Sequence, residues 1–294
     1  MASLGLALSG GSARGLAHIG VLEALHEIGV VPTYVSGTSI GALVGALYAR
    51  SGSPLDLREQ ARAIIAGPEF RALNLGRFYA PASSAWQRFK KELFEKFYLG
   101  RLLFRESHLH EDKTRRIFSS IFGDLTFRDL RLSFICNALD IRTGEEILFD
   151  HGALADAVWA SCAIPGIFHP RTADARVLID GGMTNNIPVE PVRRLGARTV
   201  IAAYLGSVPY YTGPADTGFK INSRALAFTR YRLDQRILGL ADAVINPDLS
   251  DFHWADFSRL DELVEIGRQA VFSARDRIRS VTSPWYRVRK LFRR

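Results

Sequence analysis

Short apolar runs alternate with longer segments of helical periodicity along this chain. The run from Leu4 to Leu8 is typical of a short buried strand. Residues 13–29 follow, with leucine or isoleucine recurring every third position on one helical face. A second apolar run ends at Ser36, and a second helical pattern begins after Ser39. This order predicts a three-layer α/β/α fold with a mainly parallel central sheet.

The rest of the chain continues the same alternation. Further strands are expected at residues 133–138, 146–149, 176–179, 199–203 and 243–245. Further helices are expected at residues 55–65, 86–97, 112–121, 154–163, 224–240 and 258–278. Residues 207–218, with two prolines and two glycines, are expected to form a surface loop that could serve as a lid. We see no linker before residue 275, so we expect one catalytic domain over residues 1–274 and a basic tail over residues 275–294.

Composition places the chain among ordinary globular proteins. Of its 294 residues, 47% are hydrophobic and 23% are charged. No apolar run reaches the roughly 20 residues that span a bilayer, and the first residues lack the basic leader of a signal peptide. Two cysteines, Cys136 and Cys162, provide neither a disulfide framework nor a metal-ligand spacing. We therefore expect a cytoplasmic protein without a bound metal.

The net charge of +8 is concentrated at one end of the chain. Residues 275–294 contain eight basic residues and one acidic residue, which leaves the body nearly neutral. After Pro284, the apolar residues Trp285, Val288, Leu291 and Phe292 fall on one face of this tail. Such a segment suits the surface of an anionic bilayer, so we expect peripheral contact with the inner face of a membrane. The alternative is a disordered, solvated tail.

A second amphipathic stripe lies in the helix expected at residues 86–97. Its tryptophan, phenylalanine and leucine side chains fall opposite three lysines. Packing of this stripe into the core is favoured over a lipid-facing cap, because such stripes usually mark the buried side of a helix. The basic tail also raises the question of nucleic-acid binding. The body has neither a helix-turn-helix signal nor aromatic residues interleaved on a basic sheet face, so we do not expect a nucleic-acid partner.

Residues 37–41 read Gly-Thr-Ser-Ile-Gly between the second strand and the second helix. A Gly-x-Ser-x-Gly sequence in this position forms a sharp turn that exposes the serine hydroxyl in a cleft. Gly37 and Gly41 flank Ser39 because the tight turn leaves no room for neighbouring Cβ atoms. The pattern predicts that Ser39 is a nucleophile.

The first strand delivers a second glycine-rich segment, residues 10–15, to the start of a helix. This segment fails the phosphate-loop pattern, because no Gly-Lys-Ser/Thr closes it. It also fails the strict dinucleotide pattern, because Ser12 occupies the place of the middle glycine. Backbone N–H groups at the start of a helix can instead stabilise an oxyanion, although a glycine-rich turn without a ligand remains the alternative. We favour the oxyanion site, since both turns lie at the carboxyl ends of neighbouring parallel strands.

The strand expected at residues 176–179 ends in Asp180, which is followed by Gly181 and Gly182. A carboxylate beside apolar strand residues costs several kcal/mol unless it has a partner. Taken alone, Asp180 reads as a residue that caps a turn. Taken with the other two motifs, it becomes the candidate proton acceptor for Ser39.

These three boxes, in this order and spacing, resemble the patatin-like phospholipase family. The stretch Ala160 to Pro170 is also similar to one that the family carries before its aspartate. The resemblance covers roughly residues 4–270. It implies a lipid acyl hydrolase in which Ser39 and Asp180 form a dyad without histidine, acting on a phospholipid or lysophospholipid ester without a cofactor.

The resemblance also assigns roles to the glycine-rich loop. Backbone N–H groups around Gly10, Gly11 and Ser12 would form the oxyanion hole, and Arg14 would shape or charge that loop. The family usually has a third glycine where this chain has Ser12. The hole therefore depends on a local φ that suits a residue with a side chain.

Three alternatives stay open on the sequence. Generic hydrolases with this elbow use Ser, an acid and His in that order, and His253 is the one histidine after Asp180. The same fold can also serve as an acyltransferase or as a regulatory protein with little turnover. The sequence does not determine the oligomeric state.

Overall fold

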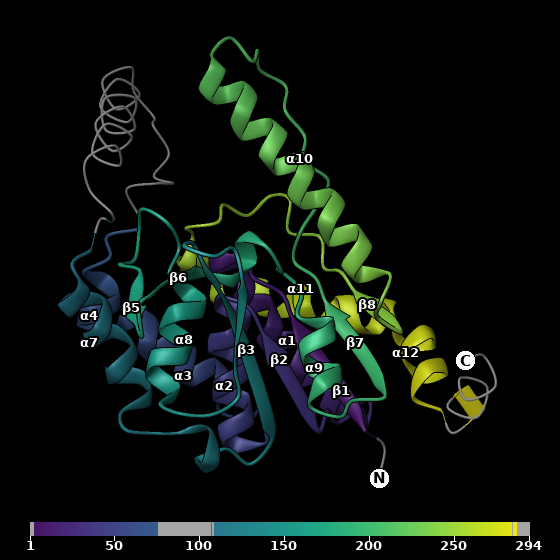
Figure 1. Cartoon of the computed structure of the whole chain (residues 1–294). Coiled ribbons are helices and arrows are strands. Elements are labelled where there is room, and N and C mark those ends of the chain that lie inside the picture. Colours follow the sequence, from purple (N-terminus) through teal and green to yellow (C-terminus); the bar gives the residue numbers. More distant parts are fainter. Residues whose placement is uncertain (1–2, 76–106, 108, 284, 287–294) are drawn as a thin grey trace.

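A twisted eight-stranded sheet forms the centre of the molecule (Figure 1). The computed structural model describes residues 3–75, 107, 109–283 and 285–286. The strands are β1 (Leu4–Leu8), β2 (Tyr34–Gly37), β3 (Ser133–Asp140), β4 (Glu146–Phe149), β5 (Arg171–Ala173), β6 (Arg176–Asp180), β7 (Thr199–Ala203) and β8 (Ala243–Ile245). Their order is β5-β6-β3-β2-β1-β7-β8, and β4 pairs with β3 off this path.

The sheet is mainly parallel, as predicted. Strands β3, β2, β1, β7 and β8 pair in parallel, whereas β4, β5 and β6 join the β3 side in antiparallel pairs. Because β1 and β2 are adjacent and parallel, the turns that follow Leu8 and Gly37 leave the same edge of the sheet. The topology therefore brings the two glycine-rich segments together.

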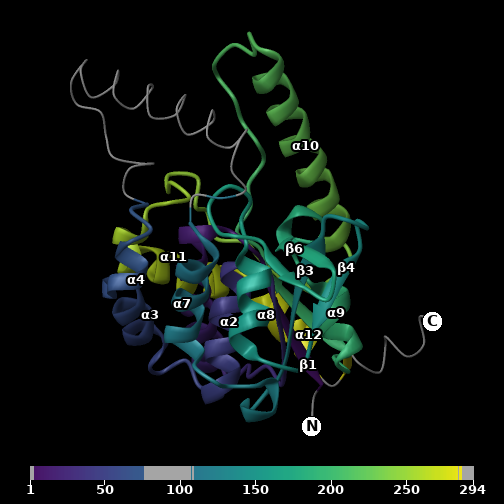
Figure 2. The same ribbon diagram turned by 60° about the vertical axis from the view of Figure 1, so that its left-hand side comes forward.

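Helices cover both faces of the sheet unequally. They are α1 (Ala17–Glu27), α2 (Ile40–Ser51), α3 (Leu57–Ala66), α4 (Pro68–Arg71), α7 (Glu111–Phe122), α8 (Leu154–Cys162), α9 (Val189–Arg194), α10 (Gly218–Leu238), α11 (Leu260–Ser273) and α12 (Arg275–Thr282). Leu6 and Leu8 pack into the large core with α1, α2, α8 and α11, while Ala7 packs on the opposite face with α9 and the end of α10. Figure 2 shows α2, α8 and α11 on one side of the sheet and α9 on the other. This alternation is the two-residue period of a strand that is buried on both faces.

Helices α1 and α11 touch through their backbones. A Cβ on Gly20 would lie 1.8 Å from the carbonyl oxygen of Val264, and one on Gly267 would lie 2.0 Å from that of Ala17. Both positions therefore accept only glycine. Since α1 begins directly after the loop at residues 10–15, this contact fixes that loop against the C-terminal part of the chain.

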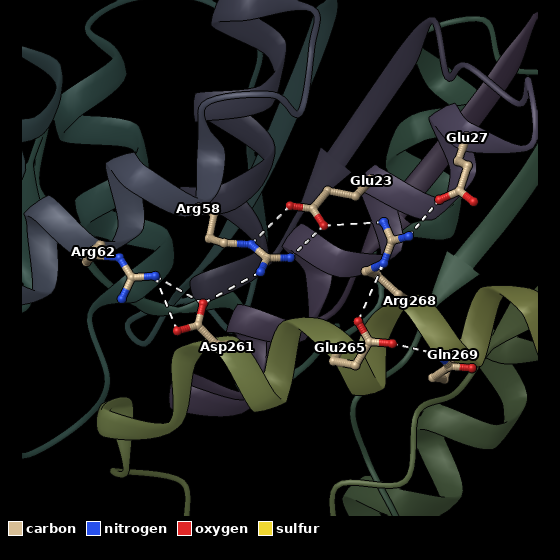
Figure 3. Close-up of polar contacts among 8 residues, drawn as sticks. All are labelled: Glu23, Glu27, Arg58, Arg62, Asp261, Glu265, Arg268 and Gln269. Carbon is tan, nitrogen blue, oxygen red and sulfur yellow. Dashed lines mark hydrogen bonds and ion pairs between the residues drawn. The ribbon is translucent and has the colours of Figure 1, made fainter.

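Ion pairs reinforce the outer side of the same helix contact (Figure 3). Glu23 of α1 accepts hydrogen bonds from Arg58 of α3 at 2.9 Å and from Arg268 of α11 at 3.5 Å. Arg268 also reaches Glu27 at 2.6 Å. These groups are partly exposed, so each ion pair contributes less to the free energy of unfolding than the buried apolar surface beneath it.

The start of the predicted basic tail forms part of this packed body. In α12, Ile278 and Val281 are buried, and Arg277 donates to the carbonyl oxygen of Asp242 at 2.8 Å. The Tyr286 hydroxyl donates to the carboxylate of Asp242 at 2.8 Å. The boundary at residue 275 stays a prediction. The tail residues 287–294 and the stripe expected at residues 86–97 lie outside the described residues.

Most predicted elements occur where we expected them, and the departures are local. The segment predicted as one helix from residue 13 begins with a 3-10 turn at Ser12–Leu16, and the segment at residues 258–278 divides into α11 and α12. Strand β5 and the short helices α4 and α9 were not predicted, because segments of three, four and six residues rarely show a period. Within the described residues, no helix is both long and apolar enough to cross a membrane.

The backbone contact between α1 and α11 predicts the effect of a single methyl group. Gly20→Ala would place its Cβ against the Val264 carbonyl, so we expect the free energy of unfolding to fall by about 1–3 kcal/mol. Urea denaturation measures this loss. Gly213→Ala is the control, because a Cβ there meets nothing within 4 Å. Equal stability of the two variants would contradict a backbone contact at this crossing.

Candidate active site

Ser39 lies in a strained turn between β2 and α2. Its φ is 56° and its ψ is −125°, a backbone conformation that residues with side chains seldom adopt. A Cβ on Gly37 would lie 2.2 Å from the carbonyl oxygen of Gly41, and one on Gly41 would lie 2.3 Å from that of Leu8. Both flanking positions therefore require glycine, and the turn has the geometry of a nucleophile elbow.

Buried polar side chains of α8 and β3 hold this turn through hydrogen bonds. The Ser39 N–H donates to the Ser161 hydroxyl at 2.9 Å, and the Thr38 hydroxyl donates to the Asn137 Oδ1 at 2.7 Å. Asn137 in turn donates to Glu146 at 2.8 Å. Sequence reasoning singled out the segment that contains Ser161 but assigned the serine no role. Neither Asn137 nor Glu146 belongs to a recognisable motif.

Asp180 approaches Ser39 from the end of β6, which is separated from β2 by β3. The Ser39 hydroxyl lies close enough to act on the pKa of the Asp180 carboxyl, and both side chains line the same cleft. The Asp180 Oδ1 accepts a hydrogen bond from the Gly182 N–H at 2.8 Å. The next residue, Gly181, packs so closely against β3 that a Cβ there would lie 2.6 Å from the carbonyl oxygen of Asn137. Ser39 and Asp180 are 5% and 6% exposed, so their contact is shielded from bulk water.

Burial raises the pKa of Asp180 above its ordinary value. The hydrogen bonds from Ser39 and Gly182 and the charge of Arg230 act in the opposite direction, and burial outweighs them. The carboxylate is therefore a stronger base than a free aspartate. The shift has the direction that a serine–aspartate pair would need, because an aspartate near pKa ~4 is a weak proton acceptor.

Arg230 of α10 is a site residue that the sequence did not reveal. Its guanidinium donates to the carbonyl oxygen of Gly182, and its charge acts on both Asp180 and Asp234. Arg230 lies 50 residues after Asp180 in the chain and belongs to no recognisable pattern. Only the packing of α10 against the turn after β6 brings it here.

The glycine-rich loop leaves two backbone N–H groups, those of Gly11 and Ser12, without an acceptor among the described residues. Gly10 donates to the carbonyl oxygen of Asn186 at 3.1 Å and Ala13 to that of Trp254 at 2.8 Å, so both are occupied. Ser12 has a φ of 53°, in the left-handed region that favours glycine, so this serine holds a conformation that residues with side chains seldom adopt.

Arg14 and His18 hold this loop in place. The Arg14 Nε donates to the carbonyl oxygen of Phe252 at 2.9 Å, and burial lowers the pKa of Arg14. His18 is fully buried with its Nε2 2.8 Å from the carbonyl oxygen of Ser9. Burial lowers the pKa of His18 to about 4, so the ring is neutral at pH 7 and donates to Ser9. His18 therefore positions the loop, whereas Arg14 both anchors the loop and lines the cleft at Ser39.

Two hollows meet at Ser39. Ser12, Ser39, Ile164 and Trp254 border both of them. The first is an apolar cavity between α2, α3, α7 and the loops around them, and its lining includes Leu43, Leu47, Ile64, Phe70, Phe118 and Phe168. The second, here called the polar cleft, combines apolar residues with polar and charged ones, which include Gly11, Arg14, Asp180, Asn186 and Arg230. Ser39 thus stands between an apolar cavity and a cleft that carries charged side chains.

His253 belongs to neither hollow. It is exposed, and its Nδ1 accepts a hydrogen bond from the N–H of Ala255 in the same loop at 3.2 Å. Among the described residues that line the cavity or the cleft, there is no histidine. The described residues also contain no group of three or more His, Cys, Asp or Glu side chains arranged to hold a metal ion.

Comparison with known proteins places this arrangement in a family context. The family model described as patatin-like phospholipase matches residues 6–193. A patatin-like phospholipase domain-containing protein of Caenorhabditis elegans is 29% identical over 90% of this chain and 20% of its own length. Lysophospholipase nte1 of Aspergillus fumigatus is 31% identical over 74% of this chain and 13% of its own length. The uncharacterized NTE family protein Rv2565 of Mycobacterium tuberculosis is 28% identical over 92% of this chain and 46% of its own length.

The chain therefore spans less than half the length of these curated relatives. Among solved structures, VipD of Legionella pneumophila matches 92% of this chain and 67% of its own chain, with 16% identity and a TM-score of 0.44. The sequence matches, rather than this structural likeness, carry the assignment to a family.

The raised pKa of Asp180 predicts how its charge affects stability. A carboxyl group whose pKa is raised by folding contributes stability below its unfolded pKa, and this stability is lost as the pH rises through the folded pKa. At pH 7 the buried charge therefore opposes folding. We expect Asp180→Asn to have a higher free energy of unfolding than the wild type at pH 7, by an amount that shrinks as the pH falls.

Asp248→Asn is the control with the opposite sign. The hydroxyl and N–H of Ser250 lower the pKa of Asp248, so its stabilising effect is present at pH 7 and lost in acid. Urea denaturation of both variants at several pH values makes the comparison. An Asp180→Asn variant that is less stable than the wild type at pH 7 would contradict a costly buried charge.

Proposed function

The chain belongs to the patatin-like phospholipase family, and from that premise we propose that it hydrolyses carboxylic esters of membrane lipids with a Ser39–Asp180 dyad. The observation that carries the proposal is the proximity of Ser39 and Asp180 in the polar cleft, at the point where this cleft meets the apolar cavity. A phospholipid or lysophospholipid has the same division, with an apolar acyl chain on one side of its ester and a polar head group on the other.

The chemistry begins with acyl transfer to Ser39. Asp180 accepts the hydroxyl proton while the Ser39 oxygen attacks the ester carbonyl. The carbonyl oxygen becomes negatively charged and is held by the N–H groups of Gly11 and Ser12, which stand at the start of a helical turn. Asp180 then returns the proton to the departing alcohol, and an acyl-serine remains.

Water completes the reaction by the same route in reverse. Asp180 takes a proton from a water molecule as its oxygen attacks the acyl-serine, and the oxyanion again faces Gly11 and Ser12. The Ser39 oxygen leaves with that proton, and the fatty acid is released. No step needs a histidine, which agrees with the position of His253 outside both hollows.

In this proposal the acyl chain and the alcohol part of the substrate occupy different hollows. The acyl chain enters the apolar cavity, whose lining of leucine, isoleucine and phenylalanine excludes water from it. The alcohol side faces the cleft, where Arg14 and Arg230 supply positive charge toward a phosphate-bearing head group. Contact of the basic residues 287–294 with an anionic membrane, at the inner face of the cell membrane, forms part of the same proposal.

Replacement of Ser39 tests the nucleophile. We expect Ser39→Ala to lower kcat/KM for a lysophospholipid by at least ~10³-fold, because the attacking oxygen is lost. Ser12→Ala is the matched control: it removes a hydroxyl at the same junction but keeps the backbone N–H, so its kcat/KM should stay within about tenfold of the wild type. Fatty-acid release measures both. Hydrolysis by Ser39→Ala at the wild-type rate would refute the proposal.

Replacement of Arg230 tests the role of Asp180 as base. The charge of Arg230 lowers the pKa of Asp180, so Arg230→Gln should raise that pKa further and shift the acid limb of kcat/KM to higher pH. Arg232→Gln, an exposed neighbour on α10, is the control and should leave the limb unchanged. The measurement is the pH–rate profile on a soluble short-chain ester. Identical profiles for Arg230→Gln and the wild type would contradict Asp180 as the titrating base.

A further inference from the structure

Residues 207–233 form a projecting arm beside the active-site cleft. The arm consists of the loop 207–217 and the first sixteen residues of α10, and in both views its outer part stands clear of the body (Figures 1 and 2). All of α10 is described, and only Asp234 of its 21 residues is buried. At 1.5 Å per residue the helix is about 32 Å long, so its outer half extends far beyond the sheet.

Large apolar side chains gather on this arm. Tyr210 is 84% exposed, Phe219 64% and Leu226 61%. The other exposed apolar residues of the arm are Val208, Tyr211, Ile221, Phe228 and Leu233. A single exposed apolar residue is ordinary, but a group of this size on one projecting element marks an interaction surface.

The apolar residues flank the side of α10 that faces the body. Residues 219, 226 and 233 recur every seven positions along one flank, and residues 221 and 228 lie along the other. On the second flank the Tyr211 ring packs edge-on against Phe228, with centroids 6.1 Å apart. Contact with the body therefore leaves both flanks uncovered.

This pattern does not fit a second helix. A coiled-coil partner needs apolar residues at both the a and d positions of the heptad. With residues 219, 226 and 233 at a, the d positions are Asn222, Thr229 and Arg236, which are all polar. Apolar side chains on both flanks, interspersed with long cationic ones, instead suit the boundary between lipid head groups and acyl chains.

The charge of the arm favours an anionic surface. It contains four basic residues, Lys220, Arg224, Arg230 and Arg232, and one acidic residue, Asp216. Arg224 lies over the Tyr211 ring at 4.8 Å, which places a cation among the exposed aromatic side chains. Basic residues near an anionic bilayer strengthen binding and make it sensitive to salt.

The base of the arm is part of the active site. Arg230 lines the polar cleft and donates to the carbonyl oxygen of Gly182, beside Asp180. One turn further on, Asp234 accepts a hydrogen bond from the buried Tyr204 hydroxyl at 3.1 Å. A surface that receives the arm is therefore held next to the cleft that binds the ester.

We propose that this arm docks the protein on an anionic lipid bilayer and holds the cleft against it. The apolar flanks enter the interface, and the side chains of Lys220, Arg224 and Arg232 meet the phosphate groups. The base of the arm, with Arg230, keeps the cleft at the membrane surface. The value of this arrangement to the protein rests on the proposed function, but the docking itself does not require catalysis.

Vesicle flotation tests the arm without turnover. The full chain carrying Ser39→Ala is compared with the same chain also carrying Phe219→Ser, Ile221→Ser and Leu226→Ser. The matched control carries Val31→Ser, Leu55→Ser and Ile141→Ser, which replaces three apolar residues that are similarly exposed elsewhere on the body. The vesicles contain phosphatidylcholine with or without phosphatidylglycerol. The same arm variant with Ser39 intact is assayed on a soluble short-chain ester.

We expect the arm variant to bind phosphatidylglycerol vesicles at least about tenfold more weakly, whereas the control binds as before. Hydrolysis of the soluble ester should stay within about twofold of the wild type, since none of the three side chains lines the cavity or the cleft. In chains truncated after Tyr286, the arm substitutions should weaken vesicle binding by the same factor, because the arm acts separately from the basic tail.

Three results would overturn the proposal. They are failure of the Ser39→Ala chain to bind these vesicles, equal binding by the arm variant and the control, and loss of self-association in the arm variant while vesicle binding is unchanged. The last result would assign the surface to a second copy of the chain. Weaker flotation of the arm variant together with no lipid hydrolysis by the wild type would keep the docking surface and reject the proposed function. Ser39-dependent lipid hydrolysis with unchanged flotation would do the reverse.

Discussion

The approach of three backbone segments around Ser39 is the constraint on which the rest of the structure depends. The turn after β2 passes so close to the end of β1 and to the first turn of α2 that Gly37 and Gly41 have no space for a Cβ. This crowding holds Ser39 at a positive φ and directs its side chain toward Asp180. Strain of this kind persists only where the surroundings over-determine it. The strained turn is held here by three contacts: the Ser161 hydroxyl, the Thr38–Asn137 hydrogen bond and the buried start of α2.

The register of the sheet then sets the partner of Ser39. Gly37 of β2 lies beside Cys136 of β3, and two residues further along β3 Ala138 lies beside Asp180 of β6. The carboxylate is thus level with the nucleophile although β6 runs antiparallel to β3. The same position buries Asp180 and raises its pKa, so a charge that opposes folding is also the base of the proposed reaction.

Local features of the sequence predicted the chemical core of the site. The turns at residues 10–15 and 37–41 depend on glycines that their own geometry requires, and Asp180 follows an apolar strand that a short pattern identifies. The long helices and buried strands were predictable for the same reason, since a repeated apolar period is visible within one segment. The end of β6 shows the limit of this reasoning: the sequence indicated a strand but not that it runs antiparallel to β3.

Residues whose role depends on tertiary packing could not be found in this way. Arg230, Asn137 and Glu146 are ordinary polar residues in their own segments, and they become part of the site only because α10 and β3 pack beside the turns. The apolar residues of α10 illustrate the same limit. Their helical period is visible in the sequence, but only the fold shows that the body leaves them exposed beside the cleft.

The most direct test of the dyad is the reaction of the chain with a long-chain alkyl fluorophosphonate, followed by mass spectrometry of its peptides. An activated serine forms a covalent phosphonate adduct, so we expect one labelled peptide, with the label on Ser39, and slow or absent labelling in Asp180→Asn. Labelling of another residue, or labelling of Ser39 at the wild-type rate in Asp180→Asn, would contradict a nucleophile activated by Asp180.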